Sequence, residues 1–130
     1  MRDHTKLRAF QLADEYVLAV YSITQSFPVD ERYGLTSQLR RAAVSIASNI
    51  VEGASRASQA EYLHFLNMAY GSAKESAYQL TLAYRLKYIN EEEGKELEKQ
   101  ANMVAKTLNA LISGIKRSHN PKPKAQSPKP

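Results

Sequence analysis

The sequence predicts an all-α fold of four helices in one domain. Its 130 residues are enough for one hydrophobic core and leave no room for a second full-sized domain. Only 5 Gly are present, and Pro28 is the only Pro between Leu7 and Ile115, which is too little turn chemistry for a β-sandwich or barrel. Four segments instead repeat apolar residues at spacings of three and four, the pattern of amphipathic helices.

The first helix is expected over residues 6–26 and is apolar on two sides. One stripe consists of Phe10, Ala13, Val17, Val20, Thr24 and Phe27. A second stripe lies about 200° round the helix and consists of Leu12, Tyr16, Ala19 and Ile23. Pro28 ends this helix, and Gly34 permits a turn in the connector that follows.

The second helix is expected to begin with Thr36 or Ser37 as its N-cap and to end at Glu52, with Gly53 just beyond its end. Its core face would consist of Leu39, Ala43, Ile46 and Ile50. Small residues beside this face, including Ala42 and Ala47, allow another backbone to approach closely. We therefore expect tight packing against a neighbouring helix.

The third and fourth helices each begin with a capping signature. Ser58 followed by Glu61 is a capping box, and Asn90 followed by Glu93 repeats the pattern at the start of a helix expected from Glu91 to Lys116. The third helix carries a heptad stripe of Leu63, Leu66, Tyr70, Ala73, Ala77, Leu80 and Tyr84, with Tyr78, Leu82, Leu86 and Ile89 on a second side. The fourth helix carries one stripe of Leu97, Ala101, Val104, Leu108, Leu111 and Ile115.

The first and third helices thus carry more apolar surface than a monomeric bundle covers, because such a bundle buries one stripe per helix. Self-association follows as an expectation. The chain has no Cys, which excludes disulfides and thiolate chemistry and suits a reducing compartment. It also has no apolar run near the ~20 residues that span a bilayer, and its start is polar. A cytoplasmic location is expected.

The net charge of +5 is concentrated at the C-terminal end. All 13 acidic residues precede residue 99, and they are balanced by the Lys and Arg residues between Arg2 and Lys106. The excess consists of Lys116, Arg117, Lys122, Lys124 and Lys129. Because four of the five prolines lie in the same stretch, we expect a four-helix domain over residues 1–117 and a disordered Lys/Pro-rich basic tail over residues 118–130.

Several segments carry a family likeness: SQLRRAAVSIASNIVEGASR, YLHFLNMAYGSAKESAYQL and FPVDERYGL. Over residues 7–118 the chain resembles bacterial four-helix bundle proteins encoded in intervening sequences of 23S ribosomal RNA genes. The resemblance implies an antiparallel up-down four-helix bundle that assembles into a homopentameric ring. That family is similar to the accessory variability determinant proteins of diversity-generating retroelements, which bind nucleic acid and a reverse transcriptase.

No catalytic or cofactor site is indicated. Gly71-Ser72 lacks the context of a nucleophile elbow, and no Gly-rich loop follows a strand. The Glu61-x-x-His64 motif is an element of di-metal bundles, but such a site needs two of these motifs and two further Glu ligands. We expect neither a metal nor another cofactor, and we expect that the protein is not an enzyme.

Charged residues around the second helix remain as candidates for function. Glu75 lies beside core positions and is expected to form a structural ion pair that fixes helix register, with Arg41 as its partner or, alternatively, Arg56 beyond the following loop. The candidates for contacting phosphates are Arg32, Arg40, Arg56, Lys116, Arg117, Lys122 and Lys124. Solvated surface or salt bridges to Glu31 and Glu52 are the alternative for the arginines.

The sequence therefore predicts a non-catalytic, homo-oligomeric bundle that binds RNA or DNA, or a nucleic-acid-processing protein. The alternative is a protein-binding scaffold without nucleic acid. A third class, a di-metal oxidase, lacks the ligands that it needs.

Overall fold

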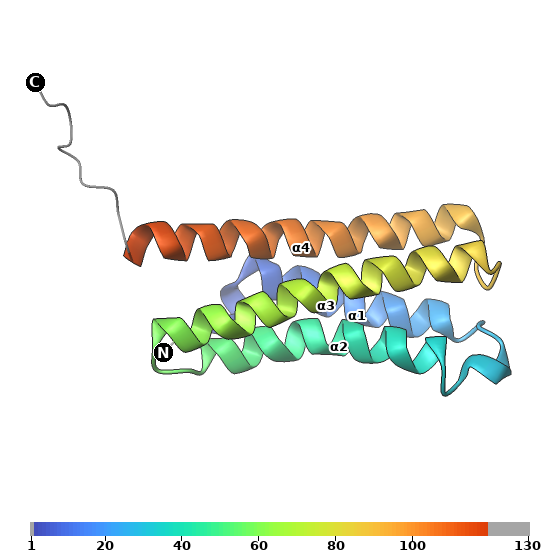
Figure 1. Cartoon of the computed structure of the whole chain (residues 1–130), viewed down its shortest axis with the longest axis horizontal. Coiled ribbons are helices and arrows are strands. Elements are labelled where there is room, and N and C mark those ends of the chain that lie inside the picture. The colour runs from blue at the N-terminus through green and yellow to red at the C-terminus, as the bar shows by residue number, and fades with distance from the viewer. Residues whose placement is uncertain (1, 120–130) are drawn as a thin grey trace, which may run out of the picture.

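Four long α-helices make up the computed structural model, which describes residues 2–119 (Figure 1). They are α1 (Arg8–Thr24), α2 (Leu35–Ala54), α3 (Gln59–Arg85) and α4 (Glu91–His119). Two short 3-10 helices, η1 (His4–Lys6) and η2 (Val29–Glu31), flank α1. No strand occurs in this part of the chain, so the expected all-α fold of four helices is confirmed.

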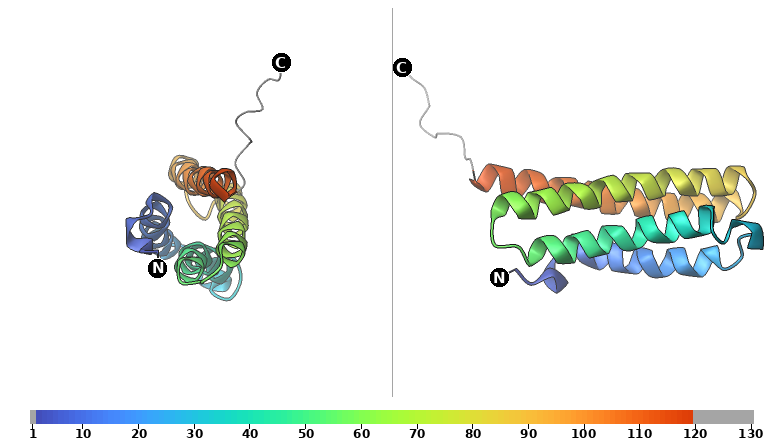
Figure 2. Two further views of the ribbon diagram at one scale, coloured as in Figure 1. Left: turned by 90° about the vertical axis from the view of Figure 1, so that its left-hand side faces the viewer. Right: turned by 60° about the horizontal axis from the view of Figure 1, so that its bottom comes forward.

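Successive helices run antiparallel and enclose one core. Each helix packs against the next in the chain, and α4 also packs against α1, as the end view in Figure 2 shows. The chain begins at the end of the bundle where the α2–α3 turn lies and where α4 finishes. The helix α4 extends to His119, two residues past the expected end of the helical domain, and residues 120–130 of the expected tail lie outside the described residues.

The capping signatures predict the starts of α3 and α4. The Ser58 hydroxyl accepts a hydrogen bond from the Glu61 backbone N–H at 3.1 Å, and the Asn90 side-chain oxygen accepts one from the Glu93 N–H at 2.8 Å. Each bond satisfies an amide that has no partner within its helix.

Both ends of α2 differ from the prediction. The helix begins at Leu35, before Thr36, because the Glu31 carboxylate accepts the Leu35 N–H at 2.8 Å and so caps this end. Gly53 does not follow the helix but lies inside its last turn, where a Cβ would stand 2.9 Å from the Phe65 Cβ. Gly53 therefore allows α3 to approach α2 closely and does not end α2.

The core uses faces that differ in part from the predicted stripes. The buried residues of α1 are Ala13, Val20 and Thr24 from the first stripe, Tyr16 from the second, and Ala9, which belongs to neither. The buried seam of α3 consists of Tyr62, Leu66, Ala69, Ala73, Ser76, Ala77, Gln79, Leu80 and Ala83. One of its two polar members, Ser76, accepts a hydrogen bond from the Tyr16 hydroxyl at 2.9 Å across the bundle.

Apolar side chains are left at the surface, but most of them lie outside the predicted stripes. On α1 and α2 these are Leu18, Tyr21, Val44 and Val51, and on α3 they include Met68 and Tyr78, with Leu86 directly after its end; only Tyr78 and Leu86 belong to the predicted second apolar side. Ile89, expected on the second side of the third helix, is buried instead. Among the described helices, none combines the length and apolar character needed to cross a membrane.

Candidate nucleic-acid interface

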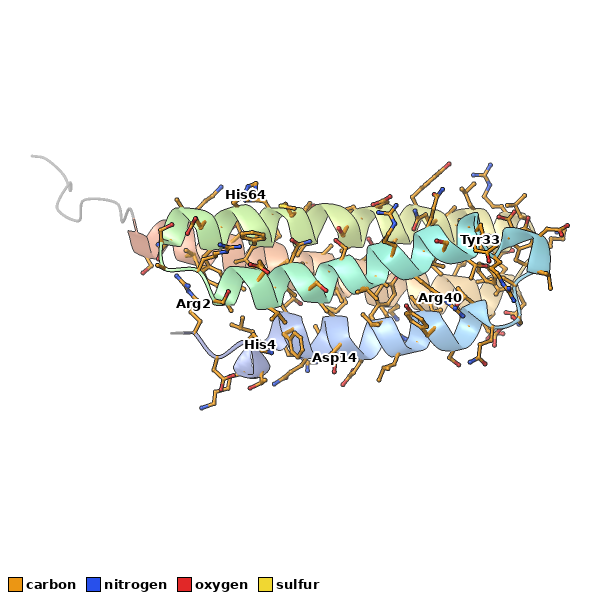
Figure 3. All side chains as sticks on the ribbon, turned by 90° about the horizontal axis from the view of Figure 1, so that it is seen from below. Arg2, His4, Asp14, Tyr33, Arg40 and His64 are labelled. Carbon is orange, nitrogen blue, oxygen red and sulfur yellow. The ribbon has the colours of Figure 1, made fainter. Side chains whose placement is uncertain are left out.

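A hollow of about 450 Å³ lies where the α1–α2 connector meets the start of α2. It is lined by Tyr21, Arg32, Tyr33, Thr36, Ser37, Arg40, Arg41 and Val44. Figure 3 shows Tyr33 and Arg40 at this end of the molecule, away from Arg2 and His64 at the other. Three guanidinium groups and two tyrosine rings therefore share one surface depression.

Arg40 is held in place by neutral oxygen atoms. Its Nε donates to the Thr24 hydroxyl at 2.7 Å, and its Nη2 donates to the Tyr21 carbonyl at 3.4 Å. The guanidinium carbon also lies 4.6 Å from the centre of the Tyr21 ring, a cation–π contact. None of these partners is a carboxylate, so the positive charge of Arg40 is positioned but not neutralised.

Arg32 and Arg41 are exposed beside Arg40. The ion pairs among the described residues are Glu52–Arg56 and Glu91–Lys95, so neither arginine pairs with an acid within that part of the chain. The acid expected to compete for them, Glu31, accepts hydrogen bonds from the Leu35 N–H and from the Tyr88 hydroxyl at 2.7 Å. Both bonds lower the pKa of the Glu31 carboxyl, and the bond from Leu35 has the larger effect. Glu31 is therefore committed to the helix start.

Tyr33 is the aromatic residue that the sequence reasoning missed. Its side chain is 87% exposed, although tyrosine usually buries most of its ring. It stands between Arg32 and Gly34 in the connector, outside every helical stripe, which is the signal that could have singled it out. A ring in this position can stack on a planar ligand.

A second arginine pair lies at the opposite end of α2, about 30 Å away at 1.5 Å per residue. Arg56 forms an ion pair with Glu52, and its guanidinium carbon lies 4.8 Å from the centre of the Phe65 ring. Arg2 donates to the Arg56 carbonyl at 2.7 Å and covers the Tyr62 ring at 4.0 Å. Here the charge of Arg56 is compensated, and Arg2 mainly satisfies carbonyls at the end of α2.

Comparison with known proteins agrees with this fold. Residues 5–110 match the sequence model of a family described as 23S rRNA-intervening sequence protein. The chain belongs to this family. The matched region includes four of the arginines discussed above, Arg32, Arg40, Arg41 and Arg56. Arg2 and Lys116 lie outside this region.

A crystal structure at 1.70 Å is similar to this chain. It is of a protein with unknown function from the S23 ribosomal protein family of Bacteroides thetaiotaomicron. The two share 24% identity over 81% of this chain and 95% of the other, with a TM-score of 0.75. At this identity the likeness supports the fold alone. No curated protein matches the chain.

The predicted ion pair between Arg41 and Glu75 is not formed. Both side chains are exposed, and the Glu75 carboxylate accepts a weak hydrogen bond from Gln79 at 3.4 Å. The prediction placed Glu75 beside the core because Ala73 and Ala77 are buried, but a residue two positions away on a helix points about 200° from them, which puts Glu75 on the exposed side. The alternative partner, Arg56, pairs with Glu52. Arg41 lines the hollow instead.

The remaining sequence candidates lie elsewhere. Lys116 and Arg117 are exposed near the end of α4, and Lys122 and Lys124 lie outside the described residues. His64 is exposed and packs edge-on against Phe65, with ring centres 5.4 Å apart. Within the described part of the chain, no three His, Asp or Glu side chains gather closely enough to hold a metal ion.

Proposed function

We propose that this protein is a non-catalytic cytoplasmic bundle that self-associates and binds RNA or DNA through the hollow at the α1–α2 connector. The observation that carries the proposal is the grouping of three guanidinium groups without a carboxylate partner beside two exposed tyrosine rings. Guanidinium groups bind phosphate oxygens in pairs of hydrogen bonds. Tyrosine rings stack on unpaired bases of any sequence.

Arg40 is suited to this role because it is already ordered. A guanidinium has five N–H donors, and contacts with Thr24 and Tyr21 hold only one edge of the group. The free donors can meet a phosphate without first ordering a long side chain, which reduces the entropy lost on binding. Arg32 and Arg41 add mobile charges around this fixed point.

The proposed assembly would multiply a weak interaction. The family resemblance implies a homopentameric ring, in which each copy presents one hollow and one basic tail. Several sites on one assembly raise the overall affinity for a long strand through effective concentration. A relationship to the accessory variability determinant proteins, and a nucleic-acid-processing protein as a further partner, belong to the same proposal.

The test measures the affinity for single-stranded RNA, folded RNA and DNA at salt concentrations from ~50 mM upwards. The part of the affinity that comes from phosphate contacts falls as the salt concentration rises. Arg32→Ala/Arg41→Ala should reduce the log-log salt slope by about 0.7 to 0.9 for each phosphate that the variant no longer binds. Tyr33→Ala should weaken single-strand binding about tenfold, because stacking on one base contributes ~1–3 kcal/mol. The matched control is Arg8→Ala/Lys106→Ala, which removes two exposed charges away from the hollow.

Two results would reject the proposal. The first is no binding to any nucleic acid at ~50 mM salt, where phosphate contacts are strongest. The second is an equal loss of affinity in the control variant, which would indicate that the protein attracts nucleic acid through its overall charge and not through the hollow. The protein-binding scaffold would then take its place, because the exposed Leu18, Val44 and Val51 on α1 and α2 favour a protein partner.

A further inference from the structure

A groove between α1 and α4 combines an apolar floor with an acidic rim. Its volume is about 660 Å³, and it is lined by Ala19, Ser22, Ile23, Ser26, Glu92, Glu93, Glu96 and Leu97. The apolar part comes from Ala19, Ile23 and Leu97. No Lys or Arg side chain lines this groove among the described residues.

The rim carries negative charge that the fold does not compensate. Glu93 accepts a hydrogen bond from the Asn90 amide at 3.2 Å, and the ion pair on this helix joins Glu91 to Lys95, outside the groove. Acids in the first turn of α4 are favoured by the helix dipole, which accounts for Glu92 and Glu93. Glu96 lies beyond that turn, so the dipole does not account for it. A cationic, partly apolar segment complements this groove.

We propose that the groove binds the Lys- and Pro-rich C-terminal segment of a second copy of this chain. Lys122 and Lys124 are two residues apart, which is about 6 Å in an extended proline-rich chain. Glu92 and Glu96 are one helical turn apart, also about 6 Å along α4. In such a chain, with three residues per turn, the two lysines lie about 120° apart around the axis, and their long flexible side chains can both reach the glutamates while proline rings cover the apolar floor.

Chain length requires that the segment come from another copy. His119 lies about 35 Å along α4 from Glu96. Five further residues reach Lys124 and span at most about 18 Å when fully extended. A chain therefore cannot bring Lys122 and Lys124 into its own groove, whereas a neighbouring copy can. The inference goes beyond the proposed function, since it requires no nucleic acid.

The first experiment titrates a fluorescent peptide with the sequence of residues 116–130 into the full-length protein at ~50 mM salt, where charge attraction is little screened. Fluorescence anisotropy should show saturable binding. In Glu92→Lys/Glu96→Lys the affinity should fall at least about tenfold, because two attractions become repulsions. The matched control Asp14→Lys/Glu75→Lys makes the same charge change at two exposed acids outside the groove and should bind normally.

A charge swap then tests the pairing itself. A peptide carrying Lys122→Glu and Lys124→Glu should bind poorly to the natural protein and regain affinity for Glu92→Lys/Glu96→Lys. Circular dichroism checks that the variants fold. If Glu92→Lys/Glu96→Lys does not fold, Glu92→Gln/Glu96→Gln replaces it in the titration of the natural peptide. Equal binding by the groove and control variants, or no recovery in the swap, would overturn the proposal.

The second experiment uses equal amounts of unlabelled and ¹⁵N-labelled full-length protein after subunit exchange. A carbodiimide joins lysines to adjacent carboxylates, and mass spectrometry should find mixed-isotope products linking Lys122 or Lys124 to Glu92 or Glu96. Products of a single isotope only would refute docking between copies. Arg32→Ala/Arg41→Ala should leave these products unchanged, so this proposal and the nucleic-acid proposal can fail separately.

Discussion

The arginines of the two clusters differ in whether a carboxylate neutralises their charge. Arg56 has Glu52 one helical turn before it, a spacing that is visible in the sequence and that forms the ion pair. Arg32 and Arg40 also have an acid nearby in the chain, Glu31, but that carboxylate is bonded to Leu35 and to Tyr88. The bond to Tyr88 spans 57 residues, so no local pattern indicates it. The sequence therefore treats Arg40 and Arg56 alike, whereas the fold distinguishes them.

Tyr16 gives a prediction about pH at the same scale. Its hydroxyl donates to Ser76 inside the core, and burial raises its pKa from 10.0 to about 12. Because the folded-state pKa is above the unfolded value, this residue's contribution is intact below about pH 10 and is lost as the pH rises towards 12. The free energy of unfolding, measured by urea titration, should fall by at most about 3 kcal/mol from this residue over that range.

Two variants separate Tyr16 from the other tyrosines. Tyr16→Phe should flatten the decline above about pH 10, since no hydroxyl remains to ionise. Tyr33→Phe removes an exposed hydroxyl and should leave the pH dependence unchanged. If both variants follow the natural protein, Tyr16 does not control alkaline stability.

At the scale of helices, the caps of α3 and α4 and the core face of α2 could be predicted, whereas the ends of α2 could not and the buried faces of α1 and α3 could be predicted only in part. Ser58 and Asn90 mark helix starts because their side chains bond amides within three residues. The face that α3 buries depends instead on its neighbours. Its seam includes Ser76, which a hydrophobic pattern rejects and which Tyr16 on a different helix makes tolerable. The predicted stripe of α3 therefore shares Leu66, Ala73, Ala77 and Leu80 with the seam, whereas its other members, Leu63, Tyr70 and Tyr84, are only partly buried.

Glycines on α2 and α3 give a matched pair of predictions about helix packing. Gly53→Ala should destabilise the protein by about 1–3 kcal/mol, because the new Cβ would lie 2.9 Å from the Phe65 Cβ and would push α2 and α3 apart. Gly71→Ala should stabilise it by about 0.5–1 kcal/mol, because beyond the adjacent backbone of α3 nothing lies within 4 Å of the added carbon and alanine favours the helix. Thermal or urea unfolding measures both. Equal effects of the two substitutions would show that close approach is not the reason for Gly53.

For the whole molecule, the sequence predicts that apolar surface is left over but not which residues supply it. On α1 the exposed apolar residues are Leu18, which is 68% exposed, and Tyr21, and neither belongs to the predicted stripes. Composition alone could not show that Val44 and Val51 on α2 would also remain exposed. That depends on which helix each face meets, and hence on the complete packing.

This surface leads to the prediction that the protein self-associates. Apolar side chains on α1 and α2 are removed from water when a second copy covers them, which stabilises the assembly by about 25 cal/mol for each Å² buried. Size-exclusion chromatography with light scattering should therefore give a mass above the 14.6 kDa of one chain, and the family resemblance implies five copies. Leu18→Asp/Val51→Asp should reduce that mass, because buried carboxylates without partners oppose association. Val29→Asp, at an 81% exposed position in η2, should not change it. A monomer at micromolar concentration would contradict self-association, whereas a dimer or trimer would contradict only the number five.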